Sequence, residues 1–273
     1  MSRRESAGQP MSFTENGSVR IHYEVVGQGP ILILHTGAGG DSRIWRDAGY
    51  VKGLAGFRLV LMDQRGRGQS SRPERLEDHR MECFVSDVNC VLDDLDVDWA
   101  GFWGYSNGAL VGIAFGAEHP TRLRALVCTG SLPFVDLTEL PPIADVPKEI
   151  GRLVSQNGVV HELELFMDRT AERFPDPIDR NVREGDPRMY ALDEVAWMSW
   201  RGPKSAYPTF PAPVLAIGGE REDSKRQTEQ SIERLPDGEV VRLVGLGHLG
   251  AFYRSDVALP FARPFLERTL RES

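Results

Sequence analysis

The sequence predicts an α/β protein built on a doubly wound, mostly parallel sheet of about eight strands. Short and uniformly apolar runs recur along the chain, and such runs are typical of strands that helices cover on both faces. They lie at residues 31–34, 58–62, 99–103, 123–128 and 214–217. Helical patterns separate these runs, and the alternation of strand and helix indicates a parallel sheet.

The first and last strands of the predicted sheet have a different pattern. Apolar residues occupy every second position in residues 19–25, which is the period of a strand with one buried face. A more mixed run at residues 239–244 is expected nearer an edge. Residues 1–12 carry Arg3 and Arg4 but no apolar run after them, so we expect a disordered tail and no signal peptide.

Apolar residues at helical spacing predict helices over residues 81–95 and 109–117. The alternation then stops, because no buried-strand run occurs between Leu132 and Tyr207. Helix-like patches fill this stretch instead, at residues 147–154, 159–174 and 189–200. We therefore expect one α/β domain, residues 13–131 and 208–273, with a helical cap of residues 132–207 inserted between its sixth and seventh strands.

Composition and charge narrow the function classes. The 273 residues include 32 Lys plus Arg and 40 Asp plus Glu, a formal charge of −8, and no basic cluster longer than Arg3-Arg4. Nucleic-acid binding draws most of its affinity from basic residues, so we expect no nucleic-acid partner. The longest apolar runs fall far short of the ~20 residues of a membrane-spanning helix, so we also expect no membrane partner.

The three cysteines, Cys83, Cys90 and Cys128, argue against a disulfide framework and against a zinc site. They are odd in number, lie in apolar periodic segments and lack C-x-x-C spacing. We expect buried thiols in a cytoplasmic protein, and no metal.

The pentapeptide Gly104-Tyr105-Ser106-Asn107-Gly108 points most directly to chemistry. A G-x-S-x-G match alone is weak, because chance produces one in a chain of this length with a probability of ~0.2. Here, however, an apolar strand leads into the motif and small residues that begin a helix follow it. In that strand-turn-helix setting a serine is exposed on a strained turn as a nucleophile. The alternative is a plain serine in a turn.

A serine nucleophile needs a histidine base and an acid that orients the histidine. His248 lies in the glycine-rich loop 245–250, directly after the last strand-like run, where it could reach a neighbouring strand end. The other histidines, including His22 and His79, are expected at the surface or at helix ends. The acid should follow the strand of residues 214–217, where three carboxylates are equivalent by chemistry alone: Glu220, Glu222 and Asp223.

The chain order of Ser106, acid and His248 resembles that of the α/β-hydrolase fold superfamily. Two further segments look like motifs of that family. His35-Thr36-Gly37 resembles the oxyanion loop after the third strand, and residues 63–70 resemble the D-x-R-G-x-G-x-S loop after the fourth. The resemblance covers nearly the whole chain from about Phe13 onward.

The resemblance implies roles for several residues. It points to Glu222 as the acid, with Asp223 as the alternative, and most relatives carry Asp at that position. Backbone N–H groups of Asn107 and Gly37 would hold the oxyanion. Thr36 stands where the family usually has Gly, which leaves Ala38 as an alternative second donor.

The predicted cap would cover Ser106 and select the substrate. Its aromatic and methionine side chains either pack a core of the cap's own or line an apolar pocket. We expect Trp197 and Trp200, at the end of the last cap helix, to line the pocket together with Tyr105. An apolar pocket implies a small to medium apolar acyl or alcohol group in the substrate.

The combined expectation is a serine hydrolase that cleaves carboxylic esters or lactones through an acyl-enzyme. Its partner is a small-molecule substrate, it uses no cofactor, and it is a monomer or a homodimer. Three alternatives stay open: an amide or C–C bond hydrolase, an acyltransferase, and a ligand sensor of the same fold with slow or no turnover. Ser106 argues against the dehalogenases and epoxide hydrolases of this family, which have Asp at the nucleophile position.

Overall fold

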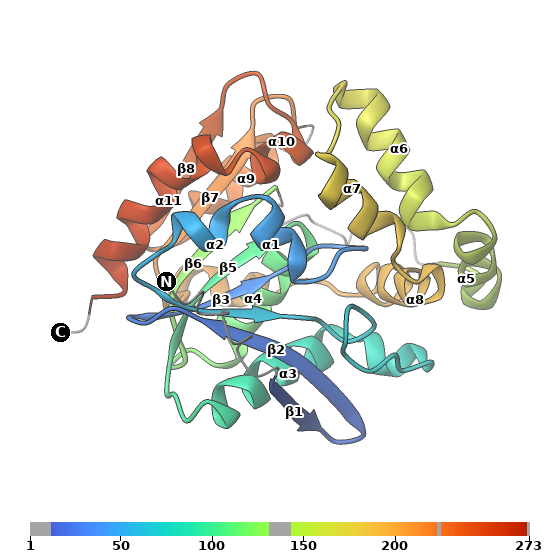
Figure 1. Ribbon diagram of the computed structural model, residues 1–273, viewed down its shortest axis with the longest axis horizontal. Coiled ribbons are helices and arrows are strands. Elements are labelled where there is room, and N and C mark those ends of the chain that lie inside the picture. Colours follow the sequence, from blue (N-terminus) through green and yellow to red (C-terminus); the bar gives the residue numbers. More distant parts are fainter. Residues whose placement is uncertain (1–11, 131–142, 223–224, 272–273) are drawn as a thin grey trace, which may run out of the picture.

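The computed structural model describes residues 12–130, 143–222 and 225–271. Eight strands form one sheet in the order β1-β2-β4-β3-β5-β6-β7-β8 (Figure 1). The strands are β1 Ser12–Asn16, β2 Val19–Val26, β3 Ile31–His35, β4 Arg58–Met62, β5 Ala100–Tyr105, β6 Leu123–Thr129, β7 Val214–Gly219 and β8 Gly238–Leu243. β2 pairs antiparallel with β1 and β4, and all other neighbours pair in parallel. The predicted doubly wound, mostly parallel sheet is therefore confirmed.

The sequence pattern does not predict β1. This short edge strand takes its register from β2, with Phe13 opposite His22, and not from an alternation of its own. Ser12, expected to belong to a disordered tail, begins β1. The other residues of that predicted tail lie outside the described residues.

Two apolar clusters lie on opposite faces of the sheet. Successive residues of β3 alternate between them, because Leu32 and Leu34 join one cluster while Ile31 and Ile33 join the other. The first cluster is covered by α1 Arg43–Asp47, α2 Tyr50–Gly53, α10 His248–Tyr253 and α11 Ser255–Thr269, and the second by α3 Met81–Asp94, α4 Asn107–Glu118 and α9 Lys225–Ile232. With both faces covered, β3, β5 and β7 are buried over their full length.

Between β6 and β7 the described residues form four α-helices, which are α5 Val146–Ser155, α6 Gly158–Thr170, α7 Asp176–Arg183 and α8 Pro187–Trp197, followed by the 3-10 helix η3 Lys204–Thr209. Figure 1 shows the four α-helices grouped at one side of the sheet, and we call them the insertion helices. The sequence pattern predicts α5, α6 and α8 but not α7, whose buried apolar side chains are only Ile178 and Val182. The limits of a cap domain at residues 132 and 207 stay predictions, because residues 131–142 lie outside the described residues.

A buried carboxylate on α8 joins the insertion helices to the core. Asp193 accepts hydrogen bonds from Arg67 Nη2 at 2.7 Å and from Gln64 Nε2 at 3.3 Å, and its Oδ1 lies 2.6 Å from His79 Nδ1. All four side chains are buried. His79 lies at a helix end, as expected, but it is fully enclosed and its Nε2 lies 2.8 Å from the Pro73 carbonyl.

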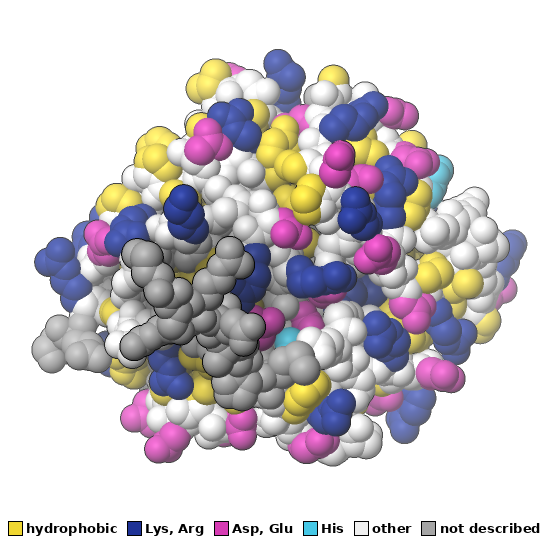
Figure 2. Space-filling view, in the orientation of Figure 1, with side chains coloured by type: hydrophobic (Ala, Val, Ile, Leu, Met, Phe, Trp, Pro, Cys, Tyr) yellow, Lys and Arg dark blue, Asp and Glu magenta, His cyan; other side chains and the backbone are white. Residues whose placement is uncertain are grey.

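Acidic and basic side chains are interspersed over the face of the molecule shown in Figure 2. Within the part of the chain that the structure describes, no helix is long and apolar enough to cross a membrane. The three cysteines carry free thiols, but only Cys128 is fully buried, while Cys83 and Cys90 are partly exposed on α3. The expectation of buried thiols therefore holds for Cys128 alone.

We predict that Asp193→Asn lowers the free energy of unfolding by about 3 kcal/mol, because it leaves the Arg67 guanidinium buried without a counter-charge. Urea denaturation measures the change. As a control, Glu267→Gln removes one partner of an exposed ion pair with Arg263 and should cost no more than about 0.5 kcal/mol. Equal and small losses in the two variants would contradict the anchoring role of Asp193.

Candidate active site

Ser106 lies on a strained turn between β5 and α4. Its backbone has φ 51° and ψ −123°, a conformation that residues other than glycine rarely adopt. The turn requires glycine on both sides. A Cβ on Gly104 would lie 2.4 Å from the Ala109 nitrogen, and a Cβ on Gly108 would lie 2.5 Å from the His35 carbonyl oxygen. The G-x-S-x-G motif thus has the strand-turn-helix setting that the sequence predicts.

Two backbone segments meet at Ser106. Asn107 is the first residue of α4, so its N–H has no acceptor within the helix. The backbone of Gly37, in the loop after β3, comes so close that a Cβ there would lie 2.7 Å from the Ser106 Cβ. Ala38 lines the same cavity as Gly37, so both remain candidate second donors.

Ser106 lines a cavity of about 260 Å³, and the insertion helices form much of its wall. The apolar lining consists of Ile44, Val159, Leu163, Phe174, Val182 and Leu249. The polar lining consists of Tyr105, Ser106, Asn107, Glu162, Tyr190, Glu194 and His248. Nowhere in the described chain do His, Cys, Asp and Glu side chains form a group that could hold a metal ion.

His248 faces the same cavity as Ser106. It is the first residue of α10, and its ring centroid lies 5.4 Å from that of Tyr105. Tyr105 in turn stacks on Phe252 with 4.0 Å between centroids. The structure therefore brings the predicted nucleophile and the predicted base to one cavity. The Ser106 hydroxyl makes no hydrogen bond to another described residue.

A carboxylate from the insertion holds the loop that carries His248. Glu172, just after α6, is buried and accepts hydrogen bonds from the N–H groups of Gly247 at 2.6 Å and of Leu249 and Gly250 at 3.2 Å. These N–H groups lie at the first turn of α10, where the helix dipole stabilises a negative charge. Nothing in the sequence pattern marks Glu172, because a single acid in a charged helical segment forms no motif.

Glu222, the predicted acid, lies in the turn after β7. Its carboxylate accepts the Gly219 N–H at 3.0 Å in the turn after β7, and among the described contacts no hydrogen bond or ion pair joins it to His248. Burial raises the pKa of Glu222 to about 7, so a large part of it is uncharged near neutral pH. The role of Glu222 as the residue that orients His248 stays a prediction. Asp223, the alternative, lies outside the described residues.

Trp197 and Trp200 do not line the cavity, which corrects the prediction for both. The Trp197 ring packs edge-on against Phe84 of α3 with 5.3 Å between centroids, and Trp200 packs against the same apolar cluster. Trp197 ends α8 and Trp200 follows it, so both lie past the part of the helix that borders the cavity. Tyr190 and Glu194, from the middle of α8, lie in the wall instead, and Tyr105 lines the cavity as well.

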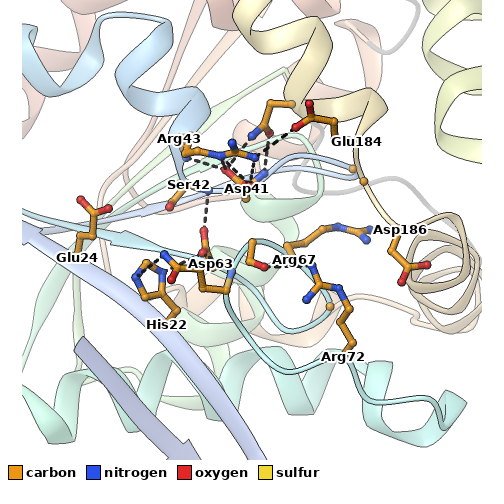
Figure 3. A pocket seen from close by; sticks show the side chains of 16 residues that line it. His22, Glu24, Asp41, Ser42, Arg43, Asp63, Arg67, Arg72, Glu184 and Asp186 are labelled. Atoms are coloured by element: carbon orange, nitrogen blue, oxygen red, sulfur yellow. Dashed lines mark hydrogen bonds and ion pairs between the residues drawn. The ribbon is translucent and has the colours of Figure 1, made fainter. Parts of the chain in front are cut away.

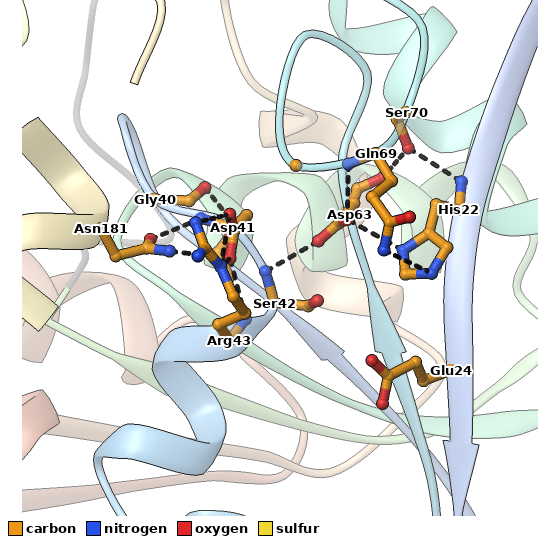
Figure 4. Close-up of polar contacts among 12 residues, drawn as sticks. His22, Glu24, Gly40, Asp41, Ser42, Arg43, Asp63, Gln69, Ser70 and Asn181 are labelled. Atoms are coloured by element: carbon orange, nitrogen blue, oxygen red, sulfur yellow. Dashed lines mark hydrogen bonds and ion pairs between the residues drawn. The ribbon is translucent and has the colours of Figure 1, made fainter. Parts of the chain in front are cut away.

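A second, polar cavity of about 380 Å³ borders the loop after β3 (Figure 3). There the Asn181 side chain from α7 forms two hydrogen bonds with Asp41 (Figure 4). The Asp41 N–H donates to Asn181 Oδ1 at 3.0 Å, and Asn181 Nδ2 donates to Asp41 Oδ1 at 2.9 Å. Arg43 pairs with the same carboxylate at 2.8 Å. The loop that carries Gly37 is thus tied to the insertion helices.

Asp63 ties the far end of the same loop to the sheet (Figure 4). Its Oδ1 accepts the Ser42 N–H at 2.9 Å, and its Oδ2 lies 2.9 Å from His22 Nδ1 and accepts the Gln69 N–H at 3.0 Å. Burial alone would raise the pKa of Asp63, but these hydrogen bonds outweigh it and lower the pKa below its ordinary value. His22 is buried in this network, so its expected surface position is wrong.

Residues 29–155 match the family model of the alpha/beta hydrolase fold. Over 167 residues the chain is 30% identical to Bifunctional epoxide hydrolase 2 of Mus musculus, a match that covers 59% of this chain and 30% of the mouse protein. Zearalenone hydrolase of Bionectria ochroleuca is 31% identical over 117 residues, which cover 42% of this chain and 44% of that protein. The matched part thus spans less than half the length of either relative.

Solved structures are similar over nearly the whole chain. A thermophilic esterase from Thermogutta terrifontis superposes with a TM-score of 0.79 at 19% identity, covering 96% of this chain and 100% of the esterase. The enol-lactonase from Burkholderia xenovorans gives a TM-score of 0.77 at 22% identity, covering 94% and 99%. At these identities the likeness establishes the fold.

We predict that Glu172→Gln loosens the first turn of α10. A neutral amide accepts hydrogen bonds more weakly than a carboxylate, so the N–H groups of Gly247 and Leu249 should exchange with solvent about tenfold faster. Hydrogen exchange followed by NMR measures these rates, and Glu164→Gln on the exposed side of α6 is the matched control. If Glu172→Gln leaves the protection of these amides unchanged, the carboxylate is not what holds the loop.

Proposed function

Because the chain belongs to the α/β-hydrolase fold superfamily, we propose that it is a serine hydrolase of carboxylic esters or lactones. The observation that carries this proposal is the backbone of Ser106. A serine held at φ 51° at the amino end of a helix, beside Gly37 and in a cavity shared with His248, has the placement that an acyl-transfer nucleophile needs.

In the proposed reaction, the hydroxyl oxygen of Ser106 attacks the substrate carbonyl while His248 removes the hydroxyl proton. The N–H groups of Asn107 and Gly37 donate to the oxyanion that forms, and each such donor is typically worth about 3 kcal/mol. His248 then returns the proton to the leaving alcohol oxygen. Water, deprotonated by His248, then attacks the carbonyl of the acyl-enzyme. The bond to the Ser106 oxygen breaks, His248 returns the proton to that oxygen, and the acid is released.

The serine supports acyl transfer over the chemistry of the epoxide hydrolases in the same superfamily. Those enzymes have an aspartate at the nucleophile position, and this chain has Ser106. The apolar lining of the cavity supports a small or medium apolar group next to the carbonyl.

We further propose that Asp223, and not Glu222, is the acid that orients His248. Glu222 is used by the turn after β7, where it accepts the Gly219 N–H, and its raised pKa makes it a poor negative partner for an imidazolium. The resemblance points to Glu222 and gives Asp223 as the alternative, and Asp223 has the residue type that most relatives use as the acid.

We predict that Ser106→Ala lowers kcat/KM for p-nitrophenyl esters and simple lactones at least about 10³-fold, because the alkyl side chain cannot attack. A spectrophotometric ester and lactone panel measures this, with Ser155→Ala, an exposed serine on α5, as the matched control.

The same panel separates the alternatives. Equal hydrolysis by wild type and Ser106→Ala would refute the nucleophile. Labelling of Ser106 by a fluorophosphonate without repeated turnover would favour a ligand sensor, and turnover of amides alone would favour an amide hydrolase.

For the acid, we predict that Asp223→Asn lowers kcat/KM about 10³-fold or more, because the imidazole loses the partner that fixes its tautomer. Glu222→Gln keeps an oxygen that can accept the Gly219 N–H, so its kcat/KM should stay close to that of wild type. The opposite ranking of the two variants would return the role to Glu222.

A further inference from the structure

The cavity that holds Ser106 is lined by two carboxylates and by no lysine or arginine among the described residues. Glu162 comes from α6 and Glu194 from α8, and neither forms an ion pair with another described residue. Apart from these two groups and the candidate catalytic residues, the wall is mostly apolar. A charged group of a molecule bound in this cavity would therefore lie near the carboxylate oxygens of Glu162 and Glu194.

Glu194 lies next to the residues of the proposed reaction. Its Oε1 accepts a hydrogen bond at 3.3 Å from the side chain of Asn107, the residue that follows the nucleophile. No donor from the described residues reaches its second carboxylate oxygen, and Glu194 is only partly buried because it faces the cavity. That second oxygen is available to a substrate.

The charges around Glu194 make the local potential negative. Burial first, and then the charges of Asp193 and Glu162, raise the pKa of Glu194 to about 7. The Asn107 hydrogen bond and the Arg67 charge act in the opposite direction without cancelling this effect, and Arg67 is itself bound to Asp193. A cation placed here would relieve the repulsion, whereas an anion would add to it.

We propose that Glu194 is a specificity-determining residue, which selects esters that carry an ammonium group and holds this group, together with Glu162, while Ser106 attacks. This inference rests on the proposed function. An unpaired carboxylate in a low-dielectric cavity is unfavourable, and a cationic ligand offsets that cost with an ion pair. Two kinds of ester fit this proposal, because the ammonium group can belong to the alcohol half or to the acyl half.

The test compares esters that differ only in charge. Acetylcholine, the acetate ester of choline, and 3,3-dimethylbutyl acetate have the same shape. The first carries a trimethylammonium group and the second carries a tert-butyl group in its place. Methyl 4-(trimethylammonio)butanoate and methyl 5,5-dimethylhexanoate form the matching pair for the acyl half. We expect kcat/KM of wild type to favour the cation at least about tenfold in one of the two pairs.

Variants then assign the preference to a residue. In Glu194→Gln the ratio of cationic to neutral ester should fall at least about threefold, because the amide carries no charge and only Glu162 remains to attract the ammonium group. In Glu164→Gln, a change of the same kind on the exposed side of α6, the ratio should stay as in wild type.

A measurement on wild type alone covers the case in which Glu194→Gln does not fold. The cationic preference should rise from about pH 6 to about pH 8, because Glu194 ionises across this range while a quaternary ammonium does not titrate. A pH effect on a reaction step that both esters of a pair share cancels in the ratio.

A ratio at or below 1 in both pairs, or a preference that is undiminished in Glu194→Gln, would overturn the inference. Hydrolysis that depends on Ser106 would at the same time leave the proposed function in place. If none of the four esters is hydrolysed, calorimetry decides the inference on its own, and the ester and lactone panel with Ser106→Ala still decides the proposed function. Choline should then bind wild type at least about tenfold more tightly than 3,3-dimethylbutan-1-ol, and equal affinities would overturn the inference.

Discussion

The backbone of Ser106, held at φ 51° between β5 and α4, is the constraint on which the rest of the site depends. Such a conformation costs a non-glycine residue about 1–3 kcal/mol and persists only where its surroundings fix it. Here β5 is paired on both sides, with β3 and with β6, and α4 packs on β5 and β6. Gly37, Gly104 and Gly108 let three backbone segments close around the serine. The most buried part of the sheet thus supports the most strained residue of the site.

The insertion helices do more than cover the cavity, because polar groups from this part of the chain hold the core loops that surround Ser106. Glu172 binds the N–H groups that begin α10, and Asn181 binds Asp41 in the loop that carries Gly37. Asp193 fixes α8 itself to Arg67. All three contacts are buried, and each is either charge-assisted or made of two hydrogen bonds. Polar contacts of these kinds are the strongest in a protein interior. The position of the insertion and the geometry of the site are therefore coupled.

Features that a local pattern specifies could be predicted from the sequence, and contacts between distant segments could not. Uniform apolar runs predicted the central strands, and the G-x-S-x-G motif placed Ser106 on its turn, because both depend on neighbours in the chain. Glu172 meets Gly247 across 75 residues, and no periodicity encodes that partner. The same limit explains Trp197, since helical spacing indicates an apolar face without indicating whether it meets the cavity or α3. The same limit applies to Glu222. The sequence alone does not distinguish it from Glu220 and Asp223, and only a contact in the folded chain, such as the one between Glu222 and the Gly219 N–H, sets it apart.

Covalent acylation of Ser106 is the first chemical step of the proposed reaction, and rapid-quench mass spectrometry detects it directly. Wild-type protein is mixed with excess p-nitrophenyl acetate, quenched in acid within one turnover, and digested. We predict a mass increase of one acetyl group on the peptide that contains Ser106, formed as fast as the first p-nitrophenol is released. Ester hydrolysis with no acyl adduct on that peptide, or with the adduct on another residue, would contradict it.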